Sequence, residues 1–123
     1  MSAVQSIARG AAAEIEIADR TLTVAKALGG RAQLARMLSV ASSQPTRWIQ
    51  GAERPSPANA RAILDLDYVI ARAGLLWAPS VIQAWLTGRN AFLAGARPID
   101  VIATEGSGPV IDALDQELAG AFA

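Results

Sequence analysis

The chain has few side chains that could perform covalent or acid–base chemistry. Its 123 residues include no cysteine and no histidine, so thiol nucleophiles, imidazole bases and the usual zinc ligands are missing. Carboxylates remain, and the closest pairs are Glu14 with Glu16 and Asp65 with Asp67. The members of each pair are two residues apart, so on a helix they point to different sides and cannot share one site. We therefore expect a protein that is not an enzyme and that uses no cofactor or metal.

Charged side chains are divided unevenly along the sequence, which favours binding over catalysis. Residues 31–61 carry five arginines and one glutamate, a net charge of +4, whereas residues 62–123 carry three arginines and seven acids, a net charge of −4. A basic middle is suited to nucleic acid, and an acidic end is suited to a different partner. Ordinary solvated surface is the alternative, and charge alone does not decide between the two.

The composition favours helices and provides more apolar surface than a small monomer needs. Hydrophobic residues make up 52% of the chain and aromatic residues only 5%, while alanine, leucine, isoleucine and arginine are abundant. Because so much apolar surface is hard to bury within one short chain, we expect a homodimer within a larger complex. The longest apolar stretch, Tyr68 to Leu86, is interrupted by Arg72, Pro79 and Gln83, so we expect no membrane span and a cytoplasmic location.

Glycine and proline mark the expected helix ends. Ala11 to Leu28 is predicted to be a helix that stops at the following glycine pair, after a disordered arm. Proline suits the first turn of a helix, where its missing N–H is not needed, and four prolines stand at such positions. They predict helices beginning at Pro57, Pro79, Pro98 and Pro109. A single turn from residue 91 to 94, capped by Asn90, is expected between the second and third of these.

The helix from Pro57 is expected to reach about Leu75 and to bury one face. Its first turn is preceded by Ser56, whose hydroxyl can cap the helix. Apolar residues then recur at helical spacing and should face a core. They are Ile63, Leu66, Ile70 and Ala73.

Residues 30–56 have the layout of two short helices joined by a turn. Leu34, Ala35 and Leu38 place apolar groups on one face of the first helix. Trp48 and Ile49 can pack the second helix against it. The outer side of the second helix is polar, as contacts with base edges and phosphates require. The polar residues are Ser42, Ser43, Gln44, Thr46, Arg47 and Gln50.

This segment resembles the DNA-binding region of the Xre family of Cro-like and phage-repressor-like proteins. The resemblance includes Arg47-Trp48 near the end of the second helix and the glycine, Gly51, that follows it. It implies that the second helix enters the major groove of DNA. It also implies base-facing roles for Ser42, Ser43, Gln44 and Arg47, and backbone contacts for Arg31 and Gln50.

Two positions depart from the family pattern. Ser39 stands in the turn where the family prefers glycine, and Pro45 stands where it prefers a β-branched apolar residue. Pro45 requires the second helix to begin at about Ser42 or Ser43, because a proline deeper inside would lose a hydrogen bond and clash. In the alternative interpretation, the two helices serve only as core or as a dimer contact.

Residues 77–114 are similar to the toxin-binding domain of the MbcA/ParS/Xre antitoxin family. The similarity is carried by Trp85-Leu86, Asn90, Leu93, Gly95 and the run Arg97-Pro98-Ile99-Asp100. With the helix-favouring composition, it predicts an all-α protein that has an Xre-like helix-turn-helix domain at residues 19–75 and a small helical toxin-binding domain at residues 76–123. An N-terminal arm at residues 1–18 is expected before them, because the first residues are small and polar. The similarity also implies a RES-domain toxin as partner, an NAD-consuming enzyme whose active site the antitoxin covers. In such systems the complex binds operator DNA and represses its own operon.

The acidic last helix supplies the expected contacts with that partner. A pocket for a dinucleotide pyrophosphate is expected to contain arginines, which Asp112, Asp115 and Glu117 would complement. Phe122 offers an apolar anchor at the end of the chain. The expected toxin-binding set also contains Arg97 and Leu118. We further expect residues 107–123 to be dispensable for the fold.

Two alternatives concern the same half of the chain. Val110, Leu114 and Leu118 recur every fourth residue, and this stripe could serve only to close the protein's own core while the acids are solvated. A stand-alone Xre-like repressor, whose C-terminal half dimerises or senses a small molecule, is the competing function. A neighbouring gene for a RES-type protein would favour the antitoxin.

Overall fold

The computed structural model describes residues 16–120, and within this range the chain forms helices and turns but no β-strand. The first helix is described over residues 16–27. The elements after it are α2 (Arg31–Leu38), α3 (Gln44–Gln50), α4 (Pro57–Ala73), α5 (Pro79–Thr87), the 3₁₀ turn η1 (Ala91–Leu93), α6 (Pro98–Glu105) and α7 (Gly108–Gly120). The all-α prediction is confirmed. Of the expected arm, residues 16–18 are already helical and residues 1–15 lie outside the described range, as does Phe122.

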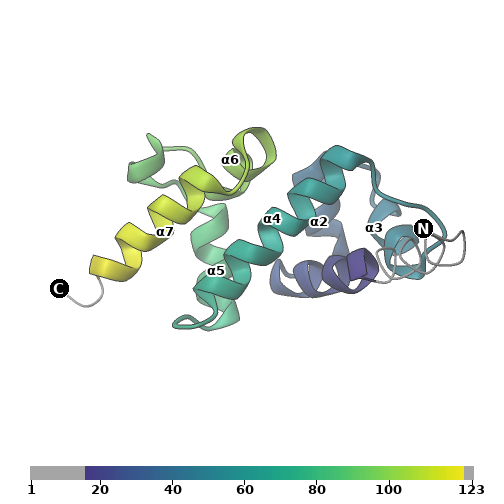
Figure 1. Ribbon diagram of the computed structural model, residues 1–123, viewed down its shortest axis with the longest axis horizontal. Coiled ribbons are helices and arrows are strands. Elements are labelled where there is room, and N and C mark those ends of the chain that lie inside the picture. The colour runs from purple at the N-terminus through teal and green to yellow at the C-terminus, as the bar shows by residue number, and fades with distance from the viewer. Residues whose placement is uncertain (1–15, 121–123) are drawn as a thin grey trace, which may run out of the picture.

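Helix α4 is the longest described helix, and the other elements gather at its two ends (Figure 1). The first helix, α2 and α3 lie at one end, and α5, α6 and α7 lie at the other. Its start follows the sequence prediction, because Ser56 Oγ accepts a hydrogen bond from the Asn59 N–H at 3.1 Å and Pro57 occupies the first turn. The helix ends at Ala73, two residues before the expected Leu75.

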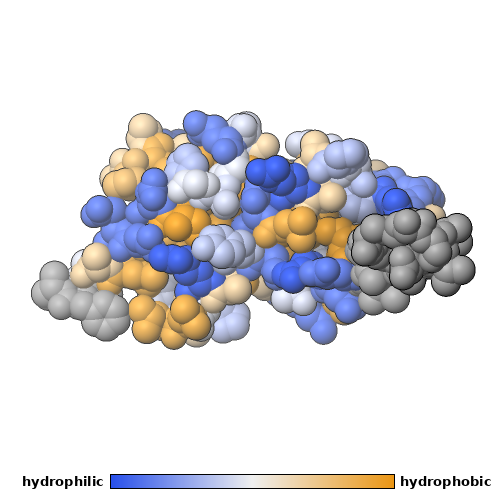
Figure 2. All heavy atoms as spheres, in the orientation of Figure 1, coloured by the Kyte–Doolittle hydropathy of each residue, from blue (hydrophilic) through white to orange (hydrophobic). Residues whose placement is uncertain are grey.

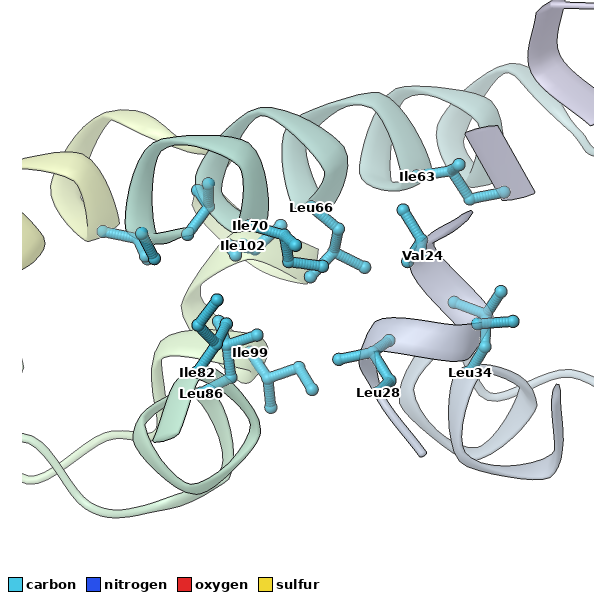
Figure 3. Close-up of a cluster of buried hydrophobic side chains, with 14 of the residues drawn as sticks. Val24, Leu28, Leu34, Ile63, Leu66, Ile70, Ile82, Leu86, Ile99 and Ile102 are labelled. Atoms are coloured by element: carbon cyan, nitrogen blue, oxygen red, sulfur yellow. The ribbon is translucent and has the colours of Figure 1, made fainter. Parts of the chain in front are cut away.

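One hydrophobic core runs along the inner face of α4. The predicted stripe on this helix is buried, with Ile63 and Leu66 among its members. In Figure 3, Leu28, which directly follows the first helix, and Leu86 and Ile99 from α5 and α6 lie below α4. The core is continuous across residue 75, where the sequence resemblance places a domain boundary. The two halves of the chain therefore share their main source of stability.

The C-terminal helix α7 completes this core. Val110 and Leu114 are both 0% exposed, and Leu118 is half-buried against the same cluster. Removing residues 107–123 would leave their partners on α4 and α6 open to water. The structure therefore contradicts the expectation that this segment is dispensable for the fold, and it favours the alternative in which the stripe closes the protein's own core.

Most of the other helix ends follow the glycine and proline pattern. Pro79 and Pro98 each occupy the first turn of their helix. Helix α7 begins at Gly108, one residue before the expected proline. Asn90 caps η1, because its Oδ1 accepts a hydrogen bond from the Phe92 N–H at 2.9 Å. None of the described helices is both long enough and apolar enough to cross a membrane.

A close contact at Gly29 connects the first helix to α5. Gly29 has φ of +95°, a value that L side chains rarely adopt. The side-chain amide of Gln83 donates a hydrogen bond to the Leu28 carbonyl beside it. A Cβ added to Gly29 would lie only 2.2 Å from Gln83 Nε2. Glycine is therefore needed here both for the backbone conformation and for the approach of α5.

We expect Gly29→Ala to lower the free energy of unfolding by more than backbone strain alone explains. Gly51→Ala is the matched control, because Gly51 has φ of +75° and no atom within 4 Å of an added Cβ. Strain costs about 1–2 kcal/mol in either variant. Gly29→Ala should lose roughly 1 kcal/mol more, because it displaces the Gln83 hydrogen bond. Urea denaturation measures the free energy of unfolding of both variants. Equal losses of stability would contradict the proposed role of the contact between Gly29 and Gln83.

Candidate functional site

Helices α2 and α3 form a pair whose inner sides are buried. Leu34 and Ala35 of α2 are buried, as are Pro45 and Trp48 of α3. Trp48 is only 3% exposed and belongs to the same core as Leu34. Its burial anchors the short helix α3 to the rest of the protein, because a helix of seven residues is not stable by itself in water. The outer side of α3 is therefore held in a fixed orientation.

The turn after α2 has a conformation that suits glycine better than serine. Ser39 ends α2 in the left-handed conformation, with φ of 55° and ψ of 44°. The N–H groups of Ser39 and Val40 bond back to the carbonyls of Arg36 and Ala35 at 3.2 and 3.0 Å. Glycine adopts this conformation without steric cost, whereas the Cβ of serine comes too close to the backbone and destabilises it.

Pro45 is accommodated at the start of α3. The helix begins at Gln44, slightly later than the sequence predicted, and Pro45 therefore lies in its first turn. The N–H groups of the first turn have no partner within a helix, so the missing N–H of proline leaves no bond broken. Ser42 and Ser43 consequently precede the helix instead of forming part of it.

The predicted DNA-binding residues gather on and around one side of α3. Ser43, Arg47 and Gln50 have the i, i+4, i+7 spacing of one helix face, and all three are exposed. Gln44 and Thr46 flank this row and are half-buried. The remaining two residues adjoin it as well: Ser42 is exposed just before α3, and Arg31 Nη1 donates to Thr46 Oγ1 at 3.2 Å. We refer to Arg31, Ser43, Thr46, Arg47 and Gln50 as the α3 polar face.

An ion pair on the α3 polar face was not anticipated from the sequence. Arg47 Nη1 lies 2.7 Å from Glu53 Oε1, although six residues separate them. Gly51 adopts φ of +75° and reverses the chain, and the Ala52 N–H then bonds the Arg47 carbonyl at 2.9 Å. Helical spacing rules do not reach across such a reversal, so the sequence pattern gave no signal for this pair. Any anion that binds Arg47 has to compete with Glu53.

Several residues that carry the antitoxin resemblance have roles within the fold itself. Leu86 is fully buried in the core, and Pro98 and Ile99 are buried at the start of α6. Asn90 caps η1, and Gly95 has φ of +85°. These roles explain why such residues occur at this spacing. They do not by themselves identify a binding partner.

The acids predicted to bind a toxin lie on the exposed side of α7, but they are not equivalent. Asp115 accepts two hydrogen bonds from Arg72 of α4, from Nη2 at 2.9 Å and Nε at 3.1 Å. Hydrogen bonding to Asp115 also raises the pKa of Arg72. Asp112 and Glu117 are exposed and have no ion-pair partner among residues 16–120. Only these two acids are available to a second molecule without breaking a contact.

Arg97 is paired with Asp100 of α6 and with none of the described acids of α7. Its Nε and Nη2 atoms donate to the two carboxylate oxygens of Asp100 at 2.8 and 3.0 Å, and these hydrogen bonds raise the pKa of Arg97. It lines a groove between α2, α5 and α6, and no residue of α7 lines that groove. The structure therefore does not bring the whole predicted toxin-binding set together.

Exposed apolar side chains lie near the junction of α4 and α5. Figure 2 shows an orange patch where the turn between these helices lies in Figure 1. Leu75 is 81% exposed, and Leu76, Val81 and Tyr68 are also exposed. Such a patch is typical of a surface that another chain covers.

Comparison of the chain with family models, curated proteins and solved structures found no match. The residues of the chain and their geometry therefore have to support any functional assignment.

We expect Ser39→Gly to stabilise the α2–α3 turn. Glycine removes the cost of a left-handed L residue, about 1–2 kcal/mol, and this gain is partly offset by the greater freedom of glycine in the unfolded chain. The free energy of unfolding should rise by roughly 0.5–1 kcal/mol. Ser43→Gly is the control, because Ser43 has φ of −80° and should gain nothing. A Ser39→Gly protein less stable than the wild type in urea would contradict this account of the turn.

Proposed function

We propose that the chain is the antitoxin of a type II toxin–antitoxin system. It binds operator DNA through the α2–α3 pair to repress its operon, and it neutralises a RES-domain NAD-consuming toxin through its C-terminal half. The observation that carries the DNA-binding part of the proposal is the two-sided character of α3. One side of the helix is buried and carries Pro45 and Trp48. The other side is exposed and carries the row of Ser43, Arg47 and Gln50.

The α3 polar face has the properties that DNA recognition requires. An α-helix fits the major groove, where amide and guanidinium groups such as those of Gln50 and Arg47 bond base edges or phosphates. Arg31 adjoins α3 from the first turn of α2, where unbonded N–H groups favour a phosphate. The surrounding residues 31–61 have a net charge of +4, which adds a favourable long-range field.

The exposed surface of the C-terminal half supports the second part of the proposal. Asp112 and Glu117 can form ion pairs with arginines of a nucleotide pocket without losing a partner among residues 16–120. Asp115 would first have to exchange Arg72 for a new partner. The apolar patch of Leu75 and Leu76 offers a surface for the toxin or for a second antitoxin chain.

A stand-alone repressor is the second candidate function, and one observation favours it. Several residues of the antitoxin resemblance are accounted for by the fold, as capping, turn and core positions, and do not need a toxin to explain their presence; they are Leu86, Asn90, Gly95, Pro98 and Ile99. Both candidates require the same DNA face. Neutralisation of a toxin is the property that separates them.

We expect Arg47→Gln to weaken binding to the DNA upstream of the protein's own gene by about tenfold, because it removes a phosphate or base contact. The slope of log affinity against log salt should fall by about one. Arg61→Gln is the matched control, since it removes the same charge from a side chain that is 81% exposed on α4. Glu53→Gln should strengthen binding by releasing Arg47. Fluorescence anisotropy over a salt series measures the DNA affinity of all three variants. If Arg47→Gln and Arg61→Gln reduce this affinity equally, α3 is excluded as the DNA-binding helix.

We expect Asp112→Asn/Glu117→Gln to abolish neutralisation of a RES-domain protein encoded beside this gene, because the loss of both charges removes the proposed contacts with the toxin's arginines. Substitution is preferred to truncation, since residues 107–123 contribute Val110 and Leu114 to the core. Asp19→Asn/Glu105→Gln carries the same change of charge on exposed residues of other elements and should still neutralise.

Growth of cells that co-express the toxin, together with co-purification, measures this effect. The DNA affinity of both double variants should equal that of the wild type. If Asp112→Asn/Glu117→Gln still rescues growth, α7 does not bind the toxin. If the wild-type chain rescues nothing and no RES-type gene lies beside it, the repressor is the better assignment.

A further inference from the structure

A groove separates α2 from the C-terminal half of the protein. Its volume is about 710 Å³, which lies within the usual range for small-molecule sites of roughly 300–1,000 Å³. One wall comes from α2 and includes Arg36 and Met37, and the other comes from α5 and includes Gln83 and Thr87. The start of α6 closes it with Arg97 and its neighbours. The proposed functions above make no use of this groove.

The α5 wall is polar although α5 is otherwise an apolar helix. Ser80, Gln83 and Thr87 have the i, i+3, i+7 spacing of one helix face and all line the groove. Ile82 and Leu86 lie on the opposite side, in the core. Gln83 is held in place because its amide donates to the Leu28 carbonyl, which leaves its Oε1 atom as an acceptor. The wall therefore offers fixed hydrogen-bonding groups.

The charge of the groove comes from three side chains. Arg97 and Asp100 neutralise each other through two hydrogen bonds. Arg36 is exposed and forms no ion pair within residues 16–120. One uncompensated cation therefore faces the groove, and it suits a ligand with one acidic group.

The floor of the groove is apolar. Leu28 and Ile99 belong to the hydrophobic core and also line the groove, and Met37 is half-buried beside them. Leu28 and Ile99 are only 2% and 3% exposed, so a ligand would remove apolar surface from water mainly at Met37. Methionine adapts to ligands of different shape because its side chain is unbranched and flexible.

We propose that this groove binds a small organic anion, with its acidic group at Arg36 and its apolar body against Met37, above the buried Leu28 and Ile99. Because α2 forms one wall and α5 and α6 form the other, the ligand contacts both halves of the protein. Its binding stabilises the folded chain by mass action. This site does not include the α3 polar face or the acids on α7. A test of ligand binding here therefore does not test the proposed function.

The probe for this proposal is 8-anilinonaphthalene-1-sulfonate, which has one sulfonate group on an aromatic body. Its neutral counterpart is N-phenyl-1-naphthylamine, which has a similar body and no charge. In fluorescence titrations, Arg36→Gln should weaken binding of the sulfonate about tenfold, as expected for loss of a charged hydrogen bond. Arg61→Gln should leave binding within about twofold, because Arg61 does not line the groove. Arg36→Gln should not change binding of the neutral counterpart.

Two further variants locate the bound probe. Ala84 lies on the groove wall, so Ala84→Phe should fill the groove and abolish sulfonate binding. Leu75→Ser/Leu76→Ser removes the exposed apolar patch and should leave binding unchanged. Circular dichroism and thermal melting establish that each variant is folded. The wild-type melting temperature should rise with the sulfonate, and that of Arg36→Gln should rise much less.

The proposal is overturned if Arg36→Gln and Arg61→Gln bind the sulfonate equally, because the acidic group then does not lie at Arg36. It is also overturned if Leu75→Ser/Leu76→Ser abolishes binding, because the probe then occupies the exposed patch. Neither of these two outcomes depends on Ala84→Phe. A folding defect in that variant would therefore not prevent the test.

Discussion

Burial of one face of α4 is the constraint on which the rest of the structure depends. A 17-residue helix with an apolar stripe is stable only when that stripe is covered, and no single neighbour covers its whole length. Helices α6 and α7 pack directly against α4, and side chains of the first helix, α2 and α5 complete the same hydrophobic cluster. All these elements contribute side chains to one hydrophobic core, which therefore extends through both halves of the chain.

This shared core determines which surfaces are free for binding. Trp48 fixes α3 by its buried side, and the polar face of that helix is thereby turned to solvent. Leu114 fixes α7 in the same way and leaves Asp112 and Glu117 exposed. The two candidate interfaces are thus on elements that are rigidly held, as recognition surfaces should be. The groove between α2 and α5 is a further consequence, since it lies where elements from both halves meet outside the core.

Several features followed from the sequence because they depend on neighbouring residues alone. Ser56, Asn90 and the prolines mark helix starts through bonds made or omitted within a few residues. The α4 stripe was predictable because helical periodicity states which residues share a face. The chain reversal at Gly51 marks the limit of such rules. It brings Glu53 to Arg47, and neither periodicity nor spacing indicates a pair of that kind.

Residue type and local spacing were sufficient to predict most of the described helices, the polar side of α3 and the division of charge. What each apolar stripe packs against became clear only from the packing of the helices. Val110 and Leu114 have the same spacing whether they bind a partner or pack in the protein's own core. In the structure they are buried on α7, which packs against α4 and α6, so they belong to the core. Contacts such as Gln83 with Leu28 and Arg72 with Asp115 join residues 55 and 43 positions apart. Such pairs depend on how whole helices pack, which no local pattern encodes.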